Sequence, residues 1–556
     1  NGDGHKLNGD GHKRFTKRLV FSAWWVVPQI IASLLSYEAE RLMIHEGGGN
    51  RRNTPEARKR ARPLLRFQRQ GPRIAGMASL SLLYPSPTLA KLADPLRLAS
   101  EIGVDDAPAP VEAVAALAAD KIGRAIRAVI PKGTPTEGPA DLRWYWAAPL
   151  LLDAQNAELG SVEWLSRPGV SSVWSAEAES DDSALGDAIA LALEVTADPT
   201  SLGRVPEDLV PVVTRQALAG PATCALRALA RGAGAVNLVS NSDLRDGAAK
   251  VSWGFRSLFN TPEVMAMLRG PRAEEDAYWQ KVLDYCLNGC LQSVLDEYAH
   301  VLREWLGILA LDTKVIGNEL GQTMYDALTV RAVNYRLDDI RPGGEDGMNV
   351  APKNLRARFA LRFGSQSAEE DGQLQRSGQV RAAFNSPFWP FVLATTSVGQ
   401  EGLDFHLYCH AVVHWNLPAN PVDLEQREGR VHRYKGHAIR KNVAASNRAA
   451  GFNRRGTDPW EGLFAAAKVG RSRGDGDLVP YWVYAPTEES ARIERYVPSL
   501  PLSREIEKLE QLKRSLAVYR LAFGQPRQDD LAAYLADLSA SRRLEVADEL
   551  RIDLSP

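Results

Sequence analysis

The residues best suited to chemistry lie at 426–433, which read QREGRVHR. Guanidinium groups match phosphate oxygens bidentately and keep their charge at any physiological pH. On a helix, Gln426, Arg430 and Arg433 would share one face, because they are spaced i, i+4 and i+7. Two arginines on one face repel each other unless an anion lies opposite. The cluster therefore predicts a phosphate-binding face, with a solvated basic face as the alternative.

A second polar cluster follows an apolar run in residues 392–406, which read VLATTSVGQEGLDFH. The three hydroxyl residues 395–397 come where a buried strand would end, and ligands bind at that end in open α/β sheets. Gly399 and Gly402 permit tight turns and a close backbone approach. Asp404 is a carboxylate that could accept a hydrogen bond from a ribose hydroxyl. A structural loop would have a similar composition, so this cluster alone does not decide its role.

These clusters need a sheet to position them, and the apolar runs of the chain predict one. Short apolar runs bounded by turn residues predict strands, and strands that alternate with amphipathic helices predict an α/β fold with a parallel sheet and helices on both faces. The expected strands are 18–24, 357–364, 390–397, 410–416 and 478–485, and the expected helices are 28–43, 371–385 and 420–434.

The sheet elements are separated by a long segment rich in alanine and leucine, whose pattern is mainly helical. We therefore expect one α/β domain that is interrupted by a large helical insertion and followed by a helical extension. The predicted parts are a disordered segment 1–16, a first strand and helix 17–45, the insertion 46–350, the rest of the α/β domain 351–490, and the extension 491–556 with helices at about 503–523 and 527–548.

Composition excludes several classes of protein. The net charge of −1 argues against a wholly basic nucleic-acid coat protein, although it allows local basic surfaces such as 46–73, which is either solvated or in contact with phosphates. Four cysteines are too few for a disulfide framework, so we expect a reducing, cytoplasmic setting. There is no apolar run of about 18 residues, so no membrane partner is expected. The first residue is not methionine, which favours a fragment of a longer protein.

The two polar clusters together resemble motifs V and VI of superfamily-two helicases. The spacing Q-R-x-G-R-x-x-R at 426–433 matches motif VI in full, and ATTSVGQEGLDFH at 394–406 resembles motif V. The context NLPANPVDLEQREGRVHR looks most like the Swi/Snf-type translocases, including bacterial members, and LVFSAWWVVP at 19–28 is similar to motif IV. The resemblance covers 17–43 and roughly 355–440, and it implies the second RecA-like lobe of an ATP-dependent helicase or translocase.

The resemblance implies a role for each matched residue at an ATP site. Arg430 and Arg433 would be arginine fingers that stabilise charge on the transferring γ-phosphoryl group, and Gln426 would contact that phosphate or the attacking water. Arg427 would pair with the facing lobe. The residues expected to bind ATP are Gly402, Asp404 and Arg427, with Asp404 reading the ribose.

The same resemblance implies contacts with a nucleic-acid backbone, and double-stranded DNA is the expected track. The residues expected to make these contacts are Ser22, Thr395, Thr396 and Gly399. Trp24 could contact nucleic acid too, but Trp24 and Trp25 are also plausible core residues, and the core is the favoured interpretation.

Half of the expected ATP site has no counterpart in these residues. The sequence contains no Gly-Lys dipeptide, so it lacks the phosphate loop of a first lobe. The stretch LDEYAH at 295–300 resembles an acidic Mg²⁺-binding box, but its apolar residues recur at helical spacing. We therefore expect an amphipathic helix with Asp296 and Glu297 facing solvent. ATP and Mg²⁺ are the expected cofactors, with the Mg²⁺ ligands on a first lobe supplied in cis or in trans, and this chain alone would be inactive.

A metal site within this chain is not expected. His406, His410 and His414 are spaced by four, but they span a predicted loop and strand and so share no helix face. The sequence therefore predicts the C-terminal lobe of a DNA helicase or translocase. The alternative is a non-catalytic helicase-like subunit that binds nucleic acid or acts as a scaffold.

Overall fold

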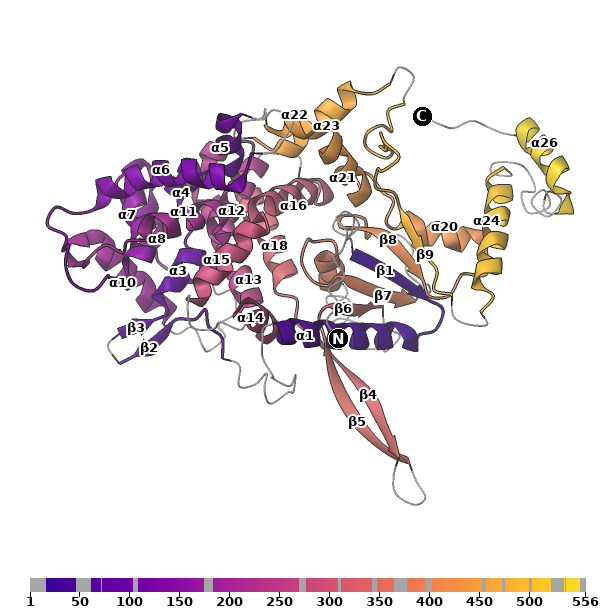
Figure 1. Ribbon diagram of the computed structural model, residues 1–556, viewed down its shortest axis with the longest axis horizontal. Helices are drawn as coiled ribbons and strands as arrows, with labels where there is room; N and C mark the ends of the chain where they lie inside the picture. Colours follow the sequence, from indigo (N-terminus) through magenta and orange to yellow (C-terminus); the bar gives the residue numbers. More distant parts are fainter. Residues whose placement is uncertain are drawn as a thin grey trace. The chain divides into compact units, whose positions relative to one another are not determined.

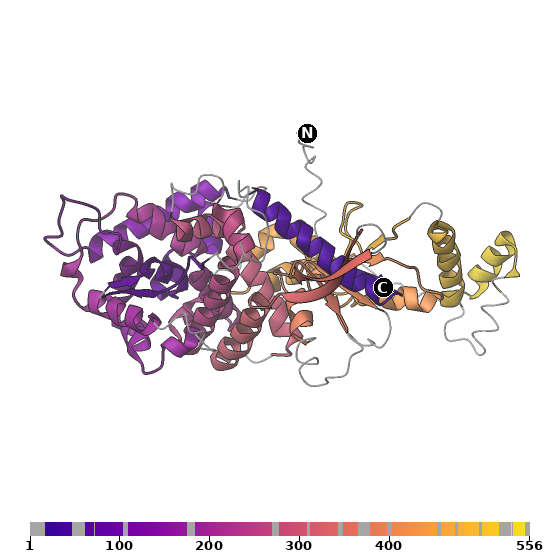
Figure 2. The same ribbon diagram turned by 90° about the horizontal axis from the view of Figure 1, so that it is seen from below.

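The computed structural model (Figures 1 and 2) describes residues 17–46, 62–71, 73–103, 109–174, 184–269, 277–308, 312–342, 348–364, 378–396, 403–452, 457–472, 476–499, 503–521, 535 and 537–550. The chain forms two compact units. We call Asn1–Tyr37, Arg331–Ser446 and Ala466–Pro556 the sheet unit, and Glu38–Val330 with Asn447–Ala465 the helical unit. Each unit is described by itself.

The sheet unit is built on five parallel strands in the order β6-β7-β1-β8-β9. The first strand in the sequence is central, because the later strands add to both of its sides (Figure 1). Its apolar residues Leu19 and Phe21 are fully buried, as expected for a strand covered on both faces. The strands are β1 (Lys17–Ser22), β6 (Ala360–Phe363), β7 (Val392–Thr396), β8 (Cys409–His414) and β9 (Glu494–Tyr496).

The register of the strands brings the predicted motifs to one edge of the sheet. Ser22 at the end of β1 lies opposite Thr396 at the end of β7, and Phe21 lies opposite His414 at the end of β8. The carboxyl ends of these parallel strands therefore share an edge, where ligands bind in open α/β sheets. This confirms the predicted α/β class, and the architecture fits a RecA-like lobe joined to helical regions.

Helices cover the sheet. The long helix α1 (Val26–Glu46) runs across the sheet (Figure 2). It packs on the sheet through Ala32, and the Ser36 hydroxyl donates to the carbonyl oxygen of Ala360 at 3.0 Å. Leu424 and Leu512 pack together and join α20 to α24. The remaining helices of the sheet unit are α20 (Pro421–Gly429), α21 (His437–Ser446), α24 (Glu505–Leu521) and α26 (Ala540–Leu550), together with a helical turn at 378–384.

Two parts of the sheet unit differ from the sequence predictions. Residues 478–485 are not a strand, and 477–482 form turns instead; the fifth strand is β9. An antiparallel hairpin, β4 (Val333–Pro342) and β5 (Met348–Ala357), was not predicted (Figure 1). Its first strand begins VNYRL, in which apolar and polar residues alternate, with Val333 and Tyr335 half-buried and Asn334 and Arg336 exposed. The signal for a half-buried strand is therefore present, and the prediction of one continuous helical segment missed it.

The helical unit is mainly α-helical, as predicted. A small antiparallel hairpin, β2 (Gln68–Gln70) and β3 (Arg73–Ala75), precedes the helices. The helices are α3 (Leu80–Leu83), α4 (Pro87–Leu92), α5 (Pro95–Ile102), α6 (Val111–Val129), α7 (Trp144–Ala154), α8 (Ser161–Ser166), α9 (Ser171–Trp174), α10 (Leu185–Ala197), α11 (Leu209–Ala219), α12 (Pro221–Gly232), α13 (Ser242–Phe259), α14 (Pro262–Arg269), α15 (Tyr278–Asn288), α16 (Leu291–Trp305), α17 (Thr313–Val315), α18 (Gly321–Leu328) and α22 (Arg448–Phe452), with short 3₁₀ and π turns between them; α23 (Pro459–Val469) begins in this unit.

The core of the helical unit contains a buried ion triad. Arg231 of α12 is 2% exposed and donates to both Asp94 and Asp296. The prediction that LDEYAH lies in a helix is confirmed by α16, but the prediction that Asp296 faces solvent is wrong. The reason is the guanidinium of Arg231, which compensates the buried carboxylate. Asp296 is therefore a structural residue of the helical core.

None of the helices in the described ranges combines the length and the apolar character needed to cross a membrane.

Candidate functional site

The ends of β1 and β8 are joined through Asn416, which follows β8. The Ser22 hydroxyl donates to Oδ1 of Asn416 at 3.0 Å, and the backbone N–H of Ala23 donates to the same oxygen at 3.3 Å. The Arg427 guanidinium of α20 donates to the backbone carbonyl of Asn416 at 3.0 Å. One residue thus fixes the loop after β1 and the helix that carries the arginine cluster.

The arginine cluster lies over the ring of Phe21. The guanidinium carbons of Arg427 and Arg430 are 5.3 and 5.6 Å from the ring centroid, and both residues are buried. Burial lowers the pKa of Arg427, and the charge of Arg430 lowers it further although Asp423 opposes the change. Two cations are therefore held close together in a poorly solvated place, where an anion would relieve their repulsion.

A carboxylate on the same helix is already neutralised within the unit. Glu428 accepts from Arg495 at 2.7 Å and lies 3.3 Å from Nε2 of His414. Burial alone would raise the pKa of Glu428, but the hydrogen bonds from Arg495 and His414 outweigh it and lower the pKa to about 2. Glu428 therefore connects α20 to β9 and β8, and its charge is compensated by Arg495 and His414.

The two helicase-like segments meet side by side. The backbone N–H of Phe405 donates to the carbonyl of Arg430 at 2.9 Å, and that of His437 donates to the carbonyl of His406 at 3.0 Å. Nε of Arg433 donates to Oδ1 of Asp404 at 2.8 Å. Both side chains are more than a third exposed, so the residue expected to read a ribose and one expected to contact phosphate lie together at the surface.

The chain turns sharply directly after Arg433. Lys435 has φ of 47°, a left-handed conformation that costs a residue with a Cβ about 1–2 kcal/mol. Its N–H donates to the carbonyl of Tyr481 at 2.7 Å, and the guanidinium of Arg440 donates to its carbonyl at 2.8 Å. The ring of Tyr434 stacks on that of Tyr481. The apolar segment that was predicted as a strand is thus used to hold this turn.

The prediction that Gln426, Arg430 and Arg433 share a helix face is wrong. Helix α20 ends at Gly429, with Arg430 as its C-cap residue and Arg433 beyond it. Glycine is a weak helix former, and the carbonyl of Arg430 bonds to Phe405 instead of continuing the helix. Gln426 is exposed on α20, whereas Arg430 is buried.

The residues expected to contact nucleic acid differ in how far they are buried. Ser22 and Thr395 are fully buried, and the Thr395 hydroxyl donates to the carbonyl of Thr396 at 3.0 Å. Thr396 is half-buried at the strand end. Gly399 lies outside the described residues, as does Gly402, which was expected at the ATP site.

The two tryptophans after β1 are not core residues, contrary to the favoured sequence interpretation. Trp24 and Trp25 are 59% and 65% exposed. Sequence reasoning missed this because an apolar strand leading into an apolar helix gives no sign of which residues lie on the turn between them.

The three histidines spaced by four are separate and buried. Burial lowers the pKa of His406 and of His410 to about 4, and it lowers that of His414 as well. Nδ1 of His410 lies 3.1 Å from Nδ1 of His437. Within the described ranges, no group of three or more His, Cys, Asp or Glu side chains is arranged to hold a metal ion.

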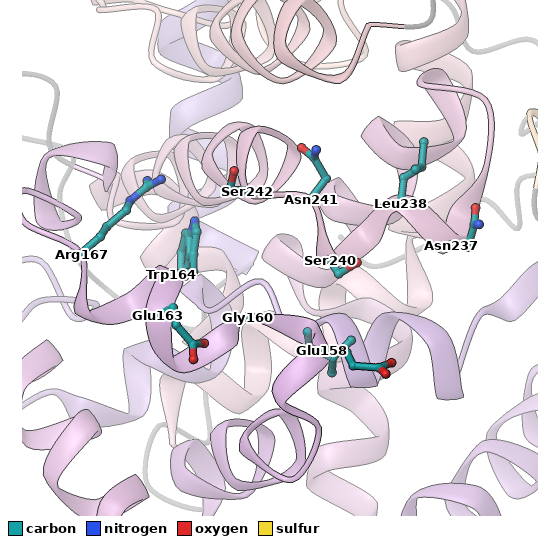
Figure 3. A pocket seen from close by; sticks show the side chains of 11 residues that line it. Glu158, Gly160, Glu163, Trp164, Arg167, Asn237, Leu238, Ser240, Asn241 and Ser242 are labelled. Atoms are coloured by element: carbon teal, nitrogen blue, oxygen red, sulfur yellow. The ribbon is translucent and has the colours of Figure 1, made fainter.

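The helical unit contains a cavity of about 660 Å³ beside α8 and the start of α13 (Figure 3). Trp164 and Arg167 form one wall, with the guanidinium 5.6 Å from the indole centroid. The indole N–H donates to Asp246 at 2.8 Å, and Arg167 pairs with the same carboxylate. Because Asp246 compensates Arg167 and the other charged lining residues are Glu158 and Glu163, this cavity is poorly suited to a phosphate.

A larger cavity of about 1050 Å³ lies between the β2–β3 hairpin and helices α7 and α10. Two of its three arginines are compensated, since Arg69 pairs with Asp187 and Arg143 with Asp141; the third is Arg73. Of the basic stretch 46–73, residues 47–61 and 72 lie outside the described residues, so both interpretations of that stretch stay open.

Comparison with known proteins agrees with the sheet unit. Residues 360–435 match the family described as helicase conserved C-terminal domain. The match begins at β6 and includes β7, β8, α20 and the arginine cluster, and it supports a superfamily-two helicase C-terminal lobe. Searches of curated proteins and of solved structures found no match.

Proposed function

We propose that the sheet unit is the second RecA-like lobe of an ATP-dependent DNA helicase or translocase, and that it completes an ATP site whose other half lies on a first lobe. The observation that carries this proposal is the meeting of residues 403–408 with 430–440 at the carboxyl edge of a parallel sheet. The helicase C-terminal match over 360–435 supports the same assignment.

The residues present fit one half of an ATP site. Arg430 and Arg433 provide positive charge for a phosphate chain, and Asp404 provides an acceptor for a ribose hydroxyl. ATP with Mg²⁺ would supply the phosphoryl group that is transferred, and the Mg²⁺ ligands are expected on the first lobe. The sequence has no phosphate loop, so this chain contributes positioning and charge stabilisation, not the primary phosphate cradle.

The pairing of Arg433 with Asp404 favours Arg433 as the residue that changes partner. Their side chains are 37% and 39% exposed, and an ion pair this exposed stabilises a protein by about 0.2–1 kcal/mol. Transfer of the guanidinium from Asp404 to a phosphate therefore costs little. Arg427 is bound to Asn416 inside the lobe, so it acts here by holding α20 in place.

Closure of this lobe on the first lobe would deliver Arg430 and Arg433 to the γ-phosphate, and repeated closure would move the protein along nucleic acid. The Swi/Snf-type sequence context favours double-stranded DNA as the track, a bacterial source and a cytoplasmic setting. The helical unit would bind duplex, guide a strand or dock a partner.

A second candidate is a non-catalytic helicase-like subunit that binds nucleic acid or serves as a scaffold. The absence of a Gly-Lys dipeptide from all 556 residues and the burial of Arg427 and Arg430 favour it. In that case the arginine cluster would stabilise the lobe and would not contact a nucleotide.

The test is nucleic-acid-stimulated ATP hydrolysis by the chain joined to its upstream sequence. The enzyme proposal predicts stimulated turnover, which Arg430→Ala removes while DNA binding is kept. Arg542→Ala is the control, because Arg542 pairs with Glu545 on the exposed surface of α26 in the same unit. No phosphate loop upstream, together with no effect of Arg430→Ala, would leave the non-catalytic subunit as the better account.

A further inference from the structure

The turn between β1 and α1 exposes two large aromatic rings. All thirteen tryptophans lie in the described residues, and Trp24 and Trp25 are the most exposed of them. A buried tryptophan removes about 150–250 Å² from water, so two exposed indoles forgo a large stabilisation. Exposed aromatic patches of this kind mark binding sites.

The backbone that carries the two rings is fixed by polar contacts. The Trp24 N–H donates to the Ser22 hydroxyl at 3.1 Å, and the Ala23 N–H donates to the side chain of Asn416 at 3.3 Å. The N–H of Val27 donates to the carbonyl of Trp24 at 3.3 Å as α1 begins. The rings are thus displayed from a rigid turn, which reduces the entropy lost on binding.

The residues around the two rings suit a ligand that has both negative charge and flat aromatic groups. The strand ends at 22–25, 362–364, 395–396 and 414–416 contain no aspartate or glutamate, and the carboxylate that contacts His414, Glu428, is paired with Arg495. The guanidinium of Arg362 lies 5.8 Å from the ring centroid of Trp25. The half-buried Thr396 and Asn416 occupy the same edge of the sheet, while the buried Ser22 hydroxyl is used within the turn.

We infer that Trp24 and Trp25 form a stacking platform for an unpaired base of a nucleic-acid strand, with Arg362 close to its phosphates. The inference rests on the proposed function insofar as the sheet unit binds nucleic acid. Bases in a duplex are stacked on each other and do not offer a free face, so the platform requires at least one unpaired position. It narrows the track from a continuous duplex to one that contains single-stranded or unpaired nucleotides.

Exposed apolar residues continue along most of α1 and would suit a protein partner such as the first lobe; they are Val26, Ile30, Leu34, Leu35, Tyr37 and Leu42. The guanidinium of Arg362 beside Trp25 favours nucleic acid at this end of the surface, whereas the stretch along α1 is apolar. A nucleic-acid strand and a protein partner can be told apart by experiment, because only a stacked strand loses affinity when its bases are removed.

The experiment uses the full 556-residue chain and three probes of equal length at one salt concentration: a labelled oligothymidine, the same backbone with abasic sites, and a duplex. The variants are Trp24→Ala/Trp25→Ala, the matching pair of phenylalanine substitutions, and Leu34→Ala as an exposed apolar control on α1. Thermal melting checks that all variants fold, which is expected because the rings are exposed.

We expect the alanine pair to weaken binding of oligothymidine by roughly five- to 150-fold for each ring that stacks. The phenylalanine pair should keep most of the affinity for oligothymidine, and Leu34→Ala should change it little. None of the three variants should change the affinity for the abasic strand. Equal affinity of wild type for oligothymidine and the abasic strand would overturn the platform, as would full affinity in the alanine pair. Full affinity for oligothymidine in the alanine pair would leave a protein interface as the better account of the exposed rings. If wild type binds none of the probes, the platform and the nucleic-acid part of the proposed function both fail. Absence of stimulated hydrolysis in the separate ATPase assay would count against the ATP site alone and would leave the platform standing.

Discussion

Replacement of single arginines should separate the structural part of the cluster from the part that acts on a ligand. Arg427→Ala removes a buried guanidinium that donates to the carbonyl of Asn416 and lies over Phe21. An unsatisfied buried carbonyl costs about 1–3 kcal/mol, and the lost cation–π contact about 0.5–2 kcal/mol. Relief of the repulsion from Arg430 offsets part of this, so we expect a net loss of about 2 kcal/mol.

Arg433→Ala should have almost no effect on stability. It removes an ion pair to Asp404 in which both side chains are more than a third exposed, and such pairs contribute about 0.2–1 kcal/mol. The two substitutions are close in sequence and lie in the same unit, so each is a control for the other.

The assay is urea unfolding of both variants at pH 7.5, with hydrogen exchange of peptides from β1 and β8 reporting on the sheet unit. Arg427→Ala should shift the midpoint downward, and Arg433→Ala should leave it within error of the wild type. If Arg433→Ala destabilises the unit as much as Arg427→Ala does, the view of Arg433 as a releasable surface arginine is wrong.

Three further predictions concern charges inside each unit. The folded pKa of Glu428, about 2, lies below its ordinary value of 4.5, so the stability that its charge contributes is present above pH 4.5 and is lost as the pH falls toward 2. Glu428→Gln should therefore cost about 3 kcal/mol of unfolding free energy at pH 7. The difference in urea midpoint between this variant and wild type should shrink on acidification. His410 is held neutral with a pKa of about 4 against an ordinary 6.5, so stability should fall as the pH drops from 6.5 toward 4, and His410→Gln should flatten that fall in the urea midpoint. Arg231→Met leaves Asp94 and Asp296 buried without their cation and should destabilise the helical unit by about 3–5 kcal/mol in calorimetry, whereas an unchanged melting temperature would show that the triad is not formed.

The sequence predicts the sheet well where burial dominates. The runs at β1, β7 and β8 are apolar on both faces, so they can be recognised without knowing their neighbours. The segment 478–485 is equally apolar but forms turns, because its aromatic residues pack on Tyr434 and its backbone receives the N–H of Lys435. That outcome depends on a contact between distant residues, which a local pattern does not contain.

The residue types identify the candidate site in the sequence, but they do not predict how its side chains are arranged in space. The spacing at 426–433 is informative about phosphate chemistry, yet the helix ends at Gly429, and Arg433 is oriented by Asp404 from another segment. Asp296 was placed at the surface because its partner Arg231 is on a different helix. In each case a residue far along the chain decides the environment of the charged group.

The most direct test of the central claim is the single-turnover rate of ATP hydrolysis by the chain joined to its upstream sequence, with saturating ATP and DNA. If Arg430 stabilises the transferring phosphoryl group, Arg430→Ala should slow this rate by about 10³–10⁵-fold while the affinities for ATP and DNA stay close to those of the wild type. A rate within tenfold of the wild type, or a loss explained by weaker ATP binding alone, would contradict the assignment of this lobe to catalysis.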